Sequence, residues 1–158
     1  MTTIRKAELS DIDDLQRLLL QVNNIHAAQR PDLFKTNGIK YSSDELSTII
    51  IDPDKPIFVA TSTNGTILGY VFCVIELNDE TSSLHQVKTL YIDDLCVDSD
   101  HRGEHIGSDL YNHAMKIAKE TGCYRVTLHA WNFNESAFGF YEKIGMTSLV
   151  TTMEQLVK

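Results

Sequence analysis

The sequence is poor in the features that build disulfide frameworks, zinc sites and membrane spans. It has three cysteines, Cys73, Cys96 and Cys123, and this odd number without C-x-x-C spacing argues against a disulfide framework or a metal site. We expect buried thiols and no bound metal. No apolar run approaches the roughly 18 residues of a membrane helix, and the first residues lack the apolar core of a signal peptide. These absences predict a cytoplasmic protein.

Positive charge is also scarce. Lys and Arg total 14 against 22 Asp and Glu, which gives a net charge of −8. Nucleic acid and anionic membranes are therefore not expected as partners, whereas a cationic small substrate would be attracted. Acidity also serves solubility alone, so it does not identify the substrate. The length of 158 residues and the 42% apolar content predict one globular domain, residues 1–158.

Hydrophobic periodicity predicts strands and helices along the whole chain. Ser10 and Asp13 form a capping-box-like start for a first helix, and Pro31 lies in a polar loop that begins at residue 26. Ser42 or Ser43 is expected to cap a second, short helix. Strands are predicted at residues 2–7, 57–62, 67–77, 90–97, 124–131 and 146–153, and helices at 10–25, 43–50, 106–121 and 134–143.

Glycines mark several expected turns. The pair Asn64-Gly65 between two predicted strands is typical of a type I′ hairpin. Gly122 and Gly145 each follow the last apolar residue of a predicted helix, where a left-handed cap is favoured. In the loop after the first helix, His26, Arg30 and Asp32 could line a pocket, but we expect a solvated connection there.

The most informative stretch is a predicted strand, turn and helix at residues 90–122. The strand is apolar apart from two adjacent carboxylates, Asp93 and Asp94. The turn leads into a helix whose first N–H groups are unpaired and lie at the positive end of its dipole, which favours an anion. Arg102 adds a cation suited to phosphate, while Gly103 and Gly107 allow close approach to the main chain.

The residues Arg102-Gly103-Glu104-His105-Ile106-Gly107 resemble the acyl-CoA-binding motif [QR]-x-x-G-x-[GA] of the GNAT N-acetyltransferase superfamily. Arg102 and Gly107 match its ends, and His105 stands where the family usually has glycine. A second string, residues 134–146, is similar to the family signature N-x-x-A-x-x-F-Y-x-x-x-G-[FM]. The order of predicted elements also matches the GNAT fold over nearly the whole chain.

This resemblance implies an α/β (α+β) fold: a mixed, mostly antiparallel sheet of six to seven strands flanked by about four helices. It also implies acetyl-CoA as the cofactor, with main-chain amides near residue 96 polarising the acetyl carbonyl. In the family, these amides are freed where one strand separates from the next. The coenzyme A-binding residues implied are Leu95, Cys96, Val97, Arg102, Gly103, Glu104, His105, Ile106, Gly107, Ser108, Asn134 and Tyr141.

The resemblance further implies direct acetyl transfer to an amine, with catalytic groups in matching positions. Tyr141 stands where the family has its general acid, and a phenol of pKa about 10 can protonate a thiolate of pKa about 8.5. Asp93 is our first choice of base, because residues 91–97 are similar to the acidic strand of the polyamine and diamine acetyltransferases. Adjacent strand residues face opposite ways, so we expect only one of Asp93 and Asp94 in the cleft. His129 is the rival base.

Other functions remain open on the sequence. A GNAT-like module that binds acyl-CoA without catalysis is conceivable because of His105. The acceptor is expected to be a small primary amine, but protein N-termini and lysine side chains are alternatives. A thiol hydrolase built on Cys96 and His129 is disfavoured, because a thiol in a buried strand is usually inert. The family also makes a homodimer possible.

Overall fold

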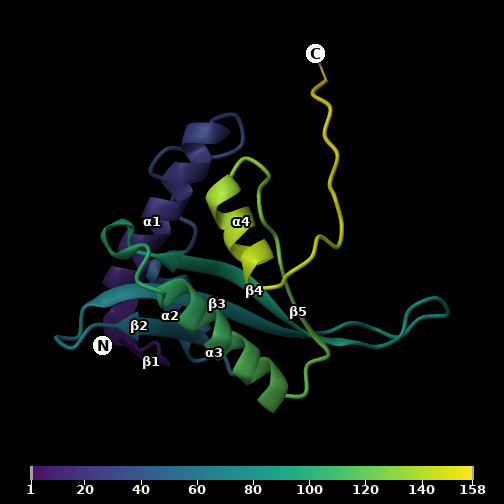
Figure 1. Ribbon diagram of the computed structural model, residues 1–158, viewed down its shortest axis with the longest axis horizontal. Helices are drawn as coiled ribbons and strands as arrows, with labels where there is room; N and C mark the ends of the chain where they lie inside the picture. Colours follow the sequence, from purple (N-terminus) through teal and green to yellow (C-terminus); the bar gives the residue numbers. More distant parts are fainter. Residues whose placement is uncertain (1, 158) are drawn as a thin grey trace.

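The computed structural model describes residues 2–157 and is built on a single mixed sheet (Figure 1). The sheet order is β1-β2-β3-β4-β5, in which β4 and β5 run parallel and the other neighbours antiparallel. This arrangement confirms the predicted mixed, mostly antiparallel architecture. The strands are β1 (Thr3–Lys6), β2 (Ile57–Thr61), β3 (Ile67–Leu77), β4 (Lys88–Val97) and β5 (Arg125–Leu128).

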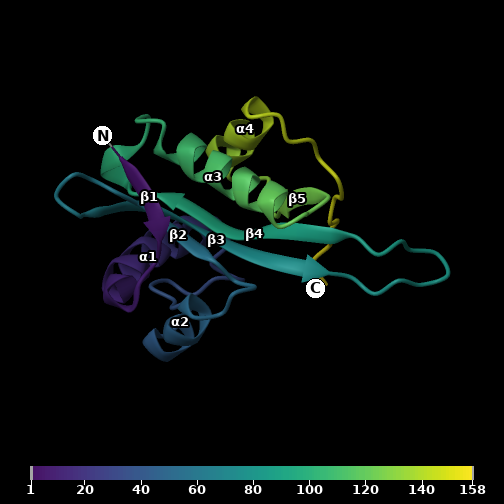
Figure 2. The same cartoon turned by 90° about the horizontal axis from the view of Figure 1, so that it is seen from below.

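Helices cover both faces of the sheet. Figure 2 shows α1 and α2 on one face and α3 and α4 on the other. The helices are α1 (Ile12–Gln29), α2 (Ser43–Ile50), α3 (Ile106–Glu120) and α4 (Glu135–Lys143), and two short 3-10 turns are η1 (Leu9–Asp11) and η2 (Ser99–His101). Both faces of the central strands are therefore buried, which explains why β2 and the first half of β3 are continuously apolar.

Two hydrophobic layers follow from this arrangement. On one face, Leu110 and Ala114 of α3 pack against Val71 and Leu90 of the sheet. On the other face, α1 and α2 pack against alternate residues of the same strands, among them Tyr70, Phe72 and Cys96. The side on which a β4 residue lies therefore decides whether it meets α3 or the α1–α2 layer.

The sheet has five strands within residues 2–157, fewer than the six to seven expected. The predicted strand at 146–153 is absent: this segment is extended but unpaired, and Figure 1 shows it arching away from α4. Met146 packs against the core, but Leu149, Val150 and Met153 are 68%, 82% and 86% exposed. The strand predicted at 124–131 is also shorter, because Trp131 leaves the sheet and packs against His26 of α1.

Helix boundaries follow the capping signals, with one exception. Ser42 caps α2 by accepting from the Glu45 N–H, and Gly122 and Gly145 have the expected positive φ after α3 and α4. The expected box of Ser10 and Asp13 is wrong. Instead, Glu8 and Asp11 form the box around η1, and α1 runs on to Gln29, so that His26 lies in the helix rather than in a loop.

The β2–β3 turn also differs from the expectation. A type I′ turn needs positive φ at both central residues, but Gly65 has φ 87° while Asn64 is not among the described residues with positive φ. The Ser62 N–H donates to the Thr66 carbonyl at 2.9 Å, which closes a three-residue loop. A separate register shift at Ala60/Thr61 leaves Leu68 as an extra residue on β3.

Candidate active site

A β-bulge in β4 organises the candidate site. Phe72 of β3 pairs with Asp94, whereas the next residue, Cys73, pairs with Ile92, so Asp93 is an extra residue on β4. Such a bulge shifts the alternation of side chains by one position. Before it, Ile92 packs on the α3 face; after it, Leu95 packs on that same face.

The bulge brings both carboxylates to the α1–α2 face, contrary to the expected alternation. The ammonium of Lys40 lies 3.2 Å from Asp93 Oδ2 and 3.6 Å from Asp94 Oδ2. Strict alternation would have sent one carboxylate to each side of the sheet. The expectation that only one of the two could face the cleft is therefore wrong, because it assumed a regular strand.

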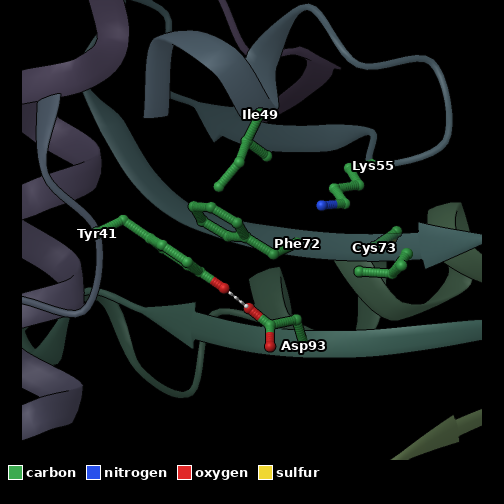
Figure 3. Close-up of a pocket in the computed structure, with 7 residues that line it drawn as sticks. Tyr41, Ile49, Lys55, Phe72, Cys73 and Asp93 are labelled. Atoms are coloured by element: carbon green, nitrogen blue, oxygen red, sulfur yellow. Dashed lines mark hydrogen bonds between the residues drawn. The ribbon is translucent and has the colours of Figure 1, made fainter. Parts of the chain in front are cut away.

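Asp93 is held by the segment that precedes α2. The Tyr41 hydroxyl donates to Asp93 Oδ2 at 2.6 Å, as Figure 3 shows. Burial raises the pKa of Tyr41, and the Asp93 carboxylate raises it further, so this phenol stays protonated as a donor. The Tyr41 ring stacks on Phe72 with centroids 5.9 Å apart, which fixes its direction.

Asp94 is the more enclosed of the pair. Its side chain is 11% exposed, against 22% for Asp93. The Tyr70 hydroxyl donates to Asp94 Oδ2 at 3.1 Å. Burial raises the pKa of Asp94, although the nearby Lys40 ammonium opposes the rise. A carboxylate whose pKa is raised accepts a proton more readily, which suits a general base.

A hollow opens beside this acidic pair. It holds about 390 Å³ of space open to solvent, and Figure 3 shows the Tyr41 and Asp93 side chains meeting at its edge. Its lining combines apolar side chains with the polar groups of Tyr41, Lys55 and Asp93. The lining residues are Tyr41, Ile49, Lys55, Phe72, Cys73, Val74 and Asp93.

β4 and β5 separate directly after the bulge begins. Their pairing runs from Thr89↔Arg125 to Ile92↔Leu128 and ends there. Successive N–H groups of an antiparallel strand point to opposite edges. Since the Asp98 N–H donates to β3 at 2.8 Å, the amides of Leu95 and Val97 point to the open edge. These two amides are suitably placed to polarise a carbonyl.

Cys96 is turned away from that open edge. By the same alternation, its amide faces β3, and its thiol lies 3.9 Å from the Leu18 carbonyl of α1. Burial raises the pKa of Cys96 to about 12. A thiol that stays protonated at neutral pH is a poor nucleophile, which further disfavours the thiol-hydrolase alternative.

The start of α3 is suited to a phosphate. α2 and α4 begin with Ser42 and Asn134, whose side chains accept an N–H of the first turn, but His105 at the start of α3 makes no such bond. The first internal bond of α3 runs from the Asp109 N–H to the His105 carbonyl. The amides of residues 106–108 therefore have no acceptor within the helix and can bind an anion.

The turn before α3 holds the other predicted phosphate-binding residues. Gly103 and His105 have φ of 83° and 64°, so the chain is left-handed at both. A β-carbon at Gly103 would meet nothing within 4 Å, whereas one at Gly107 would lie 3.5 Å from the Phe140 ring of α4. Gly107 thus brings α3 close to α4. Arg102, Glu104 and His105 are exposed and lie on the outer side of this turn.

α1 supports this turn from beneath. Arg17 forms an ion pair with Asp98, and Gln21 accepts from the Ser99 N–H at 3.2 Å. The Asp98 side chain in turn accepts from the Asp100 N–H at 3.3 Å. These contacts hold the end of β4 and the turn in a fixed position relative to α1. Sequence reasoning did not find the contacts of α1, because Arg17 and Gln21 lie 77 or more residues before Asp98 and Ser99.

Tyr141 lies on α4, where its ring is 5.2 Å from the ring of Phe140. Burial raises its pKa, and the Asp94 charge raises it further. The phenol therefore remains protonated and is available as a donor. Asn134, predicted to contact the cofactor, uses its side-chain oxygen to accept the Ala137 N–H at 3.2 Å and so caps α4.

His129, the rival base, lies just beyond the end of β5. Its Nδ1 is 3.2 Å from the Tyr91 hydroxyl, and its ring lies 5.3 Å from the Tyr91 ring. The side chain is exposed. The structure thus pairs His129 with a tyrosine, whereas Asp93 and Asp94 share one cation.

Sequence reasoning missed Lys40, Tyr41 and Tyr70, which contact the carboxylates. Lys40 and Tyr41 fall in a loop without periodicity, and Tyr70 reads as an ordinary core residue of a strand. It also missed the aromatic cluster of His26, Phe34, Trp131 and Phe133, whose neighbouring ring centroids lie 5.0–6.3 Å apart. The one available signal was the density of polar and aromatic residues in the loop before Ser42.

Comparison with known proteins tests the family resemblance. The model of the Acetyltransferase (GNAT) family matches residues 19–146. The chain belongs to this family. An uncharacterized N-acetyltransferase of Methanocaldococcus jannaschii is 32% identical over 143 residues, which cover 90% of this chain and 59% of that protein.

Other GNAT relatives extend the comparison. Streptothricin acetyltransferase of Streptomyces lavendulae is 32% identical over 94 residues, covering 60% of this chain and 46% of that protein. The chain thus spans about half the length of these two curated relatives. Among solved structures, a mutant protein from Bacillus halodurans superposes with a TM-score of 0.96 at 27% identity, over 99% of both chains. The expected GNAT fold is therefore confirmed, with fewer strands than predicted.

Metal-binding groups and membrane-spanning helices were also considered among the residues that the structure describes. Within residues 2–157, no group of three or more His, Cys, Asp and Glu side chains is arranged to hold a metal ion. None of the helices in that range is long and apolar enough to cross a membrane.

Proposed function

We propose that this GNAT protein transfers the acetyl group of acetyl-CoA to a small primary amine in a ternary complex. The observation that carries the proposal is the bulge at Asp93, which places two carboxylates beside the point where β4 leaves β5. Coenzyme A would supply the activated acetyl thioester. Its diphosphate fits the uncapped start of α3 and Arg102, and the amides of Leu95 and Val97 would polarise its acetyl carbonyl.

Asp93 and Asp94 have different proposed roles toward the acceptor amine. Asp93 receives the acceptor ammonium, because its carboxylate lies at the edge of the solvent-open hollow. Asp94 takes the proton, because burial raises its pKa and makes it the better proton acceptor. Asp94 thus replaces Asp93, our first choice from the sequence, as the proposed proton acceptor. The freed amine then attacks the acetyl carbonyl.

Tyr141 is proposed as the general acid. Its phenol is protonated because burial and the nearby Asp94 charge raise its pKa. As the C–S bond breaks, the phenol would donate its proton to the coenzyme A sulfur, and the phenolate would regain a proton from the nitrogen that has become bonded to the acetyl group. The name of the Streptomyces relative, which denotes acetyl transfer to streptothricin, supports a small acceptor.

Thiol release from acetyl-CoA tests the function. The assay is run over a panel of diamines, polyamines, amino acids and aminoglycosides, with peptides carrying free N-termini or lysine for comparison. We expect turnover with a small amine. Tyr141→Phe should lower kcat by about 10²-fold or more, with little change in KM for acetyl-CoA. Coenzyme A binding without turnover on any amine would favour the non-catalytic alternative. If Tyr141→Phe retained full kcat, the assignment of the acid would be wrong.

We also propose that a second copy pairs with the C-terminal segment, giving a homodimer in the cytoplasm. Residues 147–157 pair with no strand of the described sheet, although Glu154 forms an ion pair with Arg30, and β5 is an edge strand of that sheet. An extended apolar segment and an open sheet edge can pair between chains. Light scattering should give the mass of a dimer, and removal of residues 147–158 should give a monomer. A monomeric parent protein would refute this assembly.

A further inference from the structure

The ammonium of Lys40 lies where the acceptor amine is expected. Its Nζ is 3.2 Å from Asp93 Oδ2, 3.6 Å from Asp94 Oδ2 and 3.4 Å from the Asp93 carbonyl oxygen. We propose that Lys40 is an internal stand-in for the acceptor, and that the acceptor is a primary alkylammonium which displaces it. This inference rests on the proposed function and specifies its substrate class.

The surroundings of the Lys40 side chain fit a straight alkyl chain. Nζ lies 5.5 Å from the centroid of the Tyr41 ring, which stacks on Phe72. Ile49 continues this apolar surface into the hollow, as Figure 3 shows. A cation over an aromatic ring is favourable, and apolar stems pack on such a surface. An unbranched alkylammonium can therefore reproduce the contacts that the lysine makes.

The side chain can leave without moving its loop. The Asn23 side chain donates to the Lys35 carbonyl at 2.8 Å, and the Asn24 side chain accepts from the Asn37 N–H at 2.8 Å and donates to the Asn37 side chain at 3.0 Å. These bonds fix the loop on α1. The Lys40 side chain is itself 36% exposed, so rotation about its own bonds suffices to take it into solvent. Displacement therefore needs only a change of rotamer.

Charge makes the exchange selective. When a cationic amine replaces Lys40, both carboxylates keep an ammonium partner. A neutral ligand of the same shape would leave two partly buried carboxylates unpaired, which is costly. The acidic pair thus favours a protonated amine over an alcohol or amide of equal size. Lys40 contributes to this preference because its ammonium neutralises both carboxylates until a cationic ligand replaces it.

Binding of n-butylammonium tests the inference, because this ion reproduces the end of a lysine side chain. Its affinity is measured by calorimetry or NMR titration without acetyl-CoA. Lys40→Met removes the internal competitor and should tighten binding by about tenfold. Lys40→Gln should act in the same direction, and Lys40→Arg, which keeps a cation, should bind as weakly as the parent. n-Butanol should bind detectably to none of them.

Lys35→Met is the matched control, since it removes the same charge from an exposed position in the same loop. It should leave the affinity unchanged. If neither Lys40→Met nor Lys40→Gln bound n-butylammonium more tightly than the parent, or if n-butanol bound equally well, the inference would fail. Thiol release from acetyl-CoA tests the proposed function separately, because the binding measurement involves no acetyl transfer. Turnover on amines together with unchanged binding would overturn the role of Lys40 alone.

Discussion

The two sides of the candidate site, one proposed for coenzyme A and one for the acceptor, differ in the groups that form them. The proposed coenzyme side consists of main-chain amides at the free edge of β4 and at the uncapped start of α3. The acceptor side consists of side chains from distant segments, above all Lys40, Tyr70 and the acidic pair. Main-chain geometry follows from a local motif and is shared within a fold. Side-chain geometry depends on which segments meet, so this side is where specificity can vary.

The sharpest test of this difference compares the two carboxylates. Asp94→Asn should lower kcat by about 10²-fold or more, since it removes the proposed proton acceptor. Asp93→Asn should raise KM for the amine more than it lowers kcat, because it weakens ammonium binding. Steady-state kinetics at several pH values measures both effects. A larger loss of kcat in Asp93→Asn would reverse the two roles.

Thermal unfolding gives an independent readout for Asp94. Its pKa is raised in the folded protein, so the wild type loses stability as pH rises from the unfolded pKa of about 4 through the folded pKa. Asp94→Asn lacks this loss. We expect its Tm to exceed that of the wild type at neutral pH. The gain should disappear below about pH 4, because both proteins are then neutral at this position.

On the coenzyme side, Arg102 is the one long side chain with a predicted phosphate contact. Arg102→Met should weaken coenzyme A binding by about tenfold, since a charge-assisted hydrogen bond contributes about 1.5–3 kcal/mol. Calorimetry with coenzyme A measures the change, and amine binding should be unaffected. Unchanged coenzyme affinity would mean that the main chain alone holds the diphosphate.

The smallest expected effect is at His105. Its φ of 64° is unfavourable for a residue with a β-carbon, by about 1–2 kcal/mol. His105→Gly removes this strain but makes the unfolded chain more flexible, which offsets part of the gain. We therefore expect a Tm increase of about 1–3 °C and coenzyme A affinity within about threefold of the wild type. A large change in affinity would show that the imidazole itself contacts the coenzyme.

The sequence predicted the elements whose signals are local. Ser42, Gly122 and Gly145 were recognisable from capping preferences, and β4 and α3 from periodicity. The family strings then placed the motif of residues 102–107 and Tyr141 in one fold. These features depend on residues only a few positions apart, so they can be predicted from the sequence.

The remaining features depend on contacts between distant segments. The bulge at Asp93 exists only because β3 and β4 pair with one residue more on β4, and neither strand shows this alone. The contact between Tyr41 and Asp93 spans 52 residues. The unpaired tail was predicted as a strand because its composition suits one, whereas strand formation also needs a neighbouring edge. Each of these outcomes was set by packing rather than by propensity.

The extra residue in β4 has a consequence for how the strand tolerates change in length. Deleting Asp93 would restore regular pairing and still leave one aspartate at the position opposite Phe72. The shortened strand would keep Leu95 and Val97 on the α3 side, so the core would stay intact. The same deletion would leave a single negative charge for Lys40 to neutralise. Loss of one codon would thus turn the acidic cleft into a neutral one without unfolding the domain.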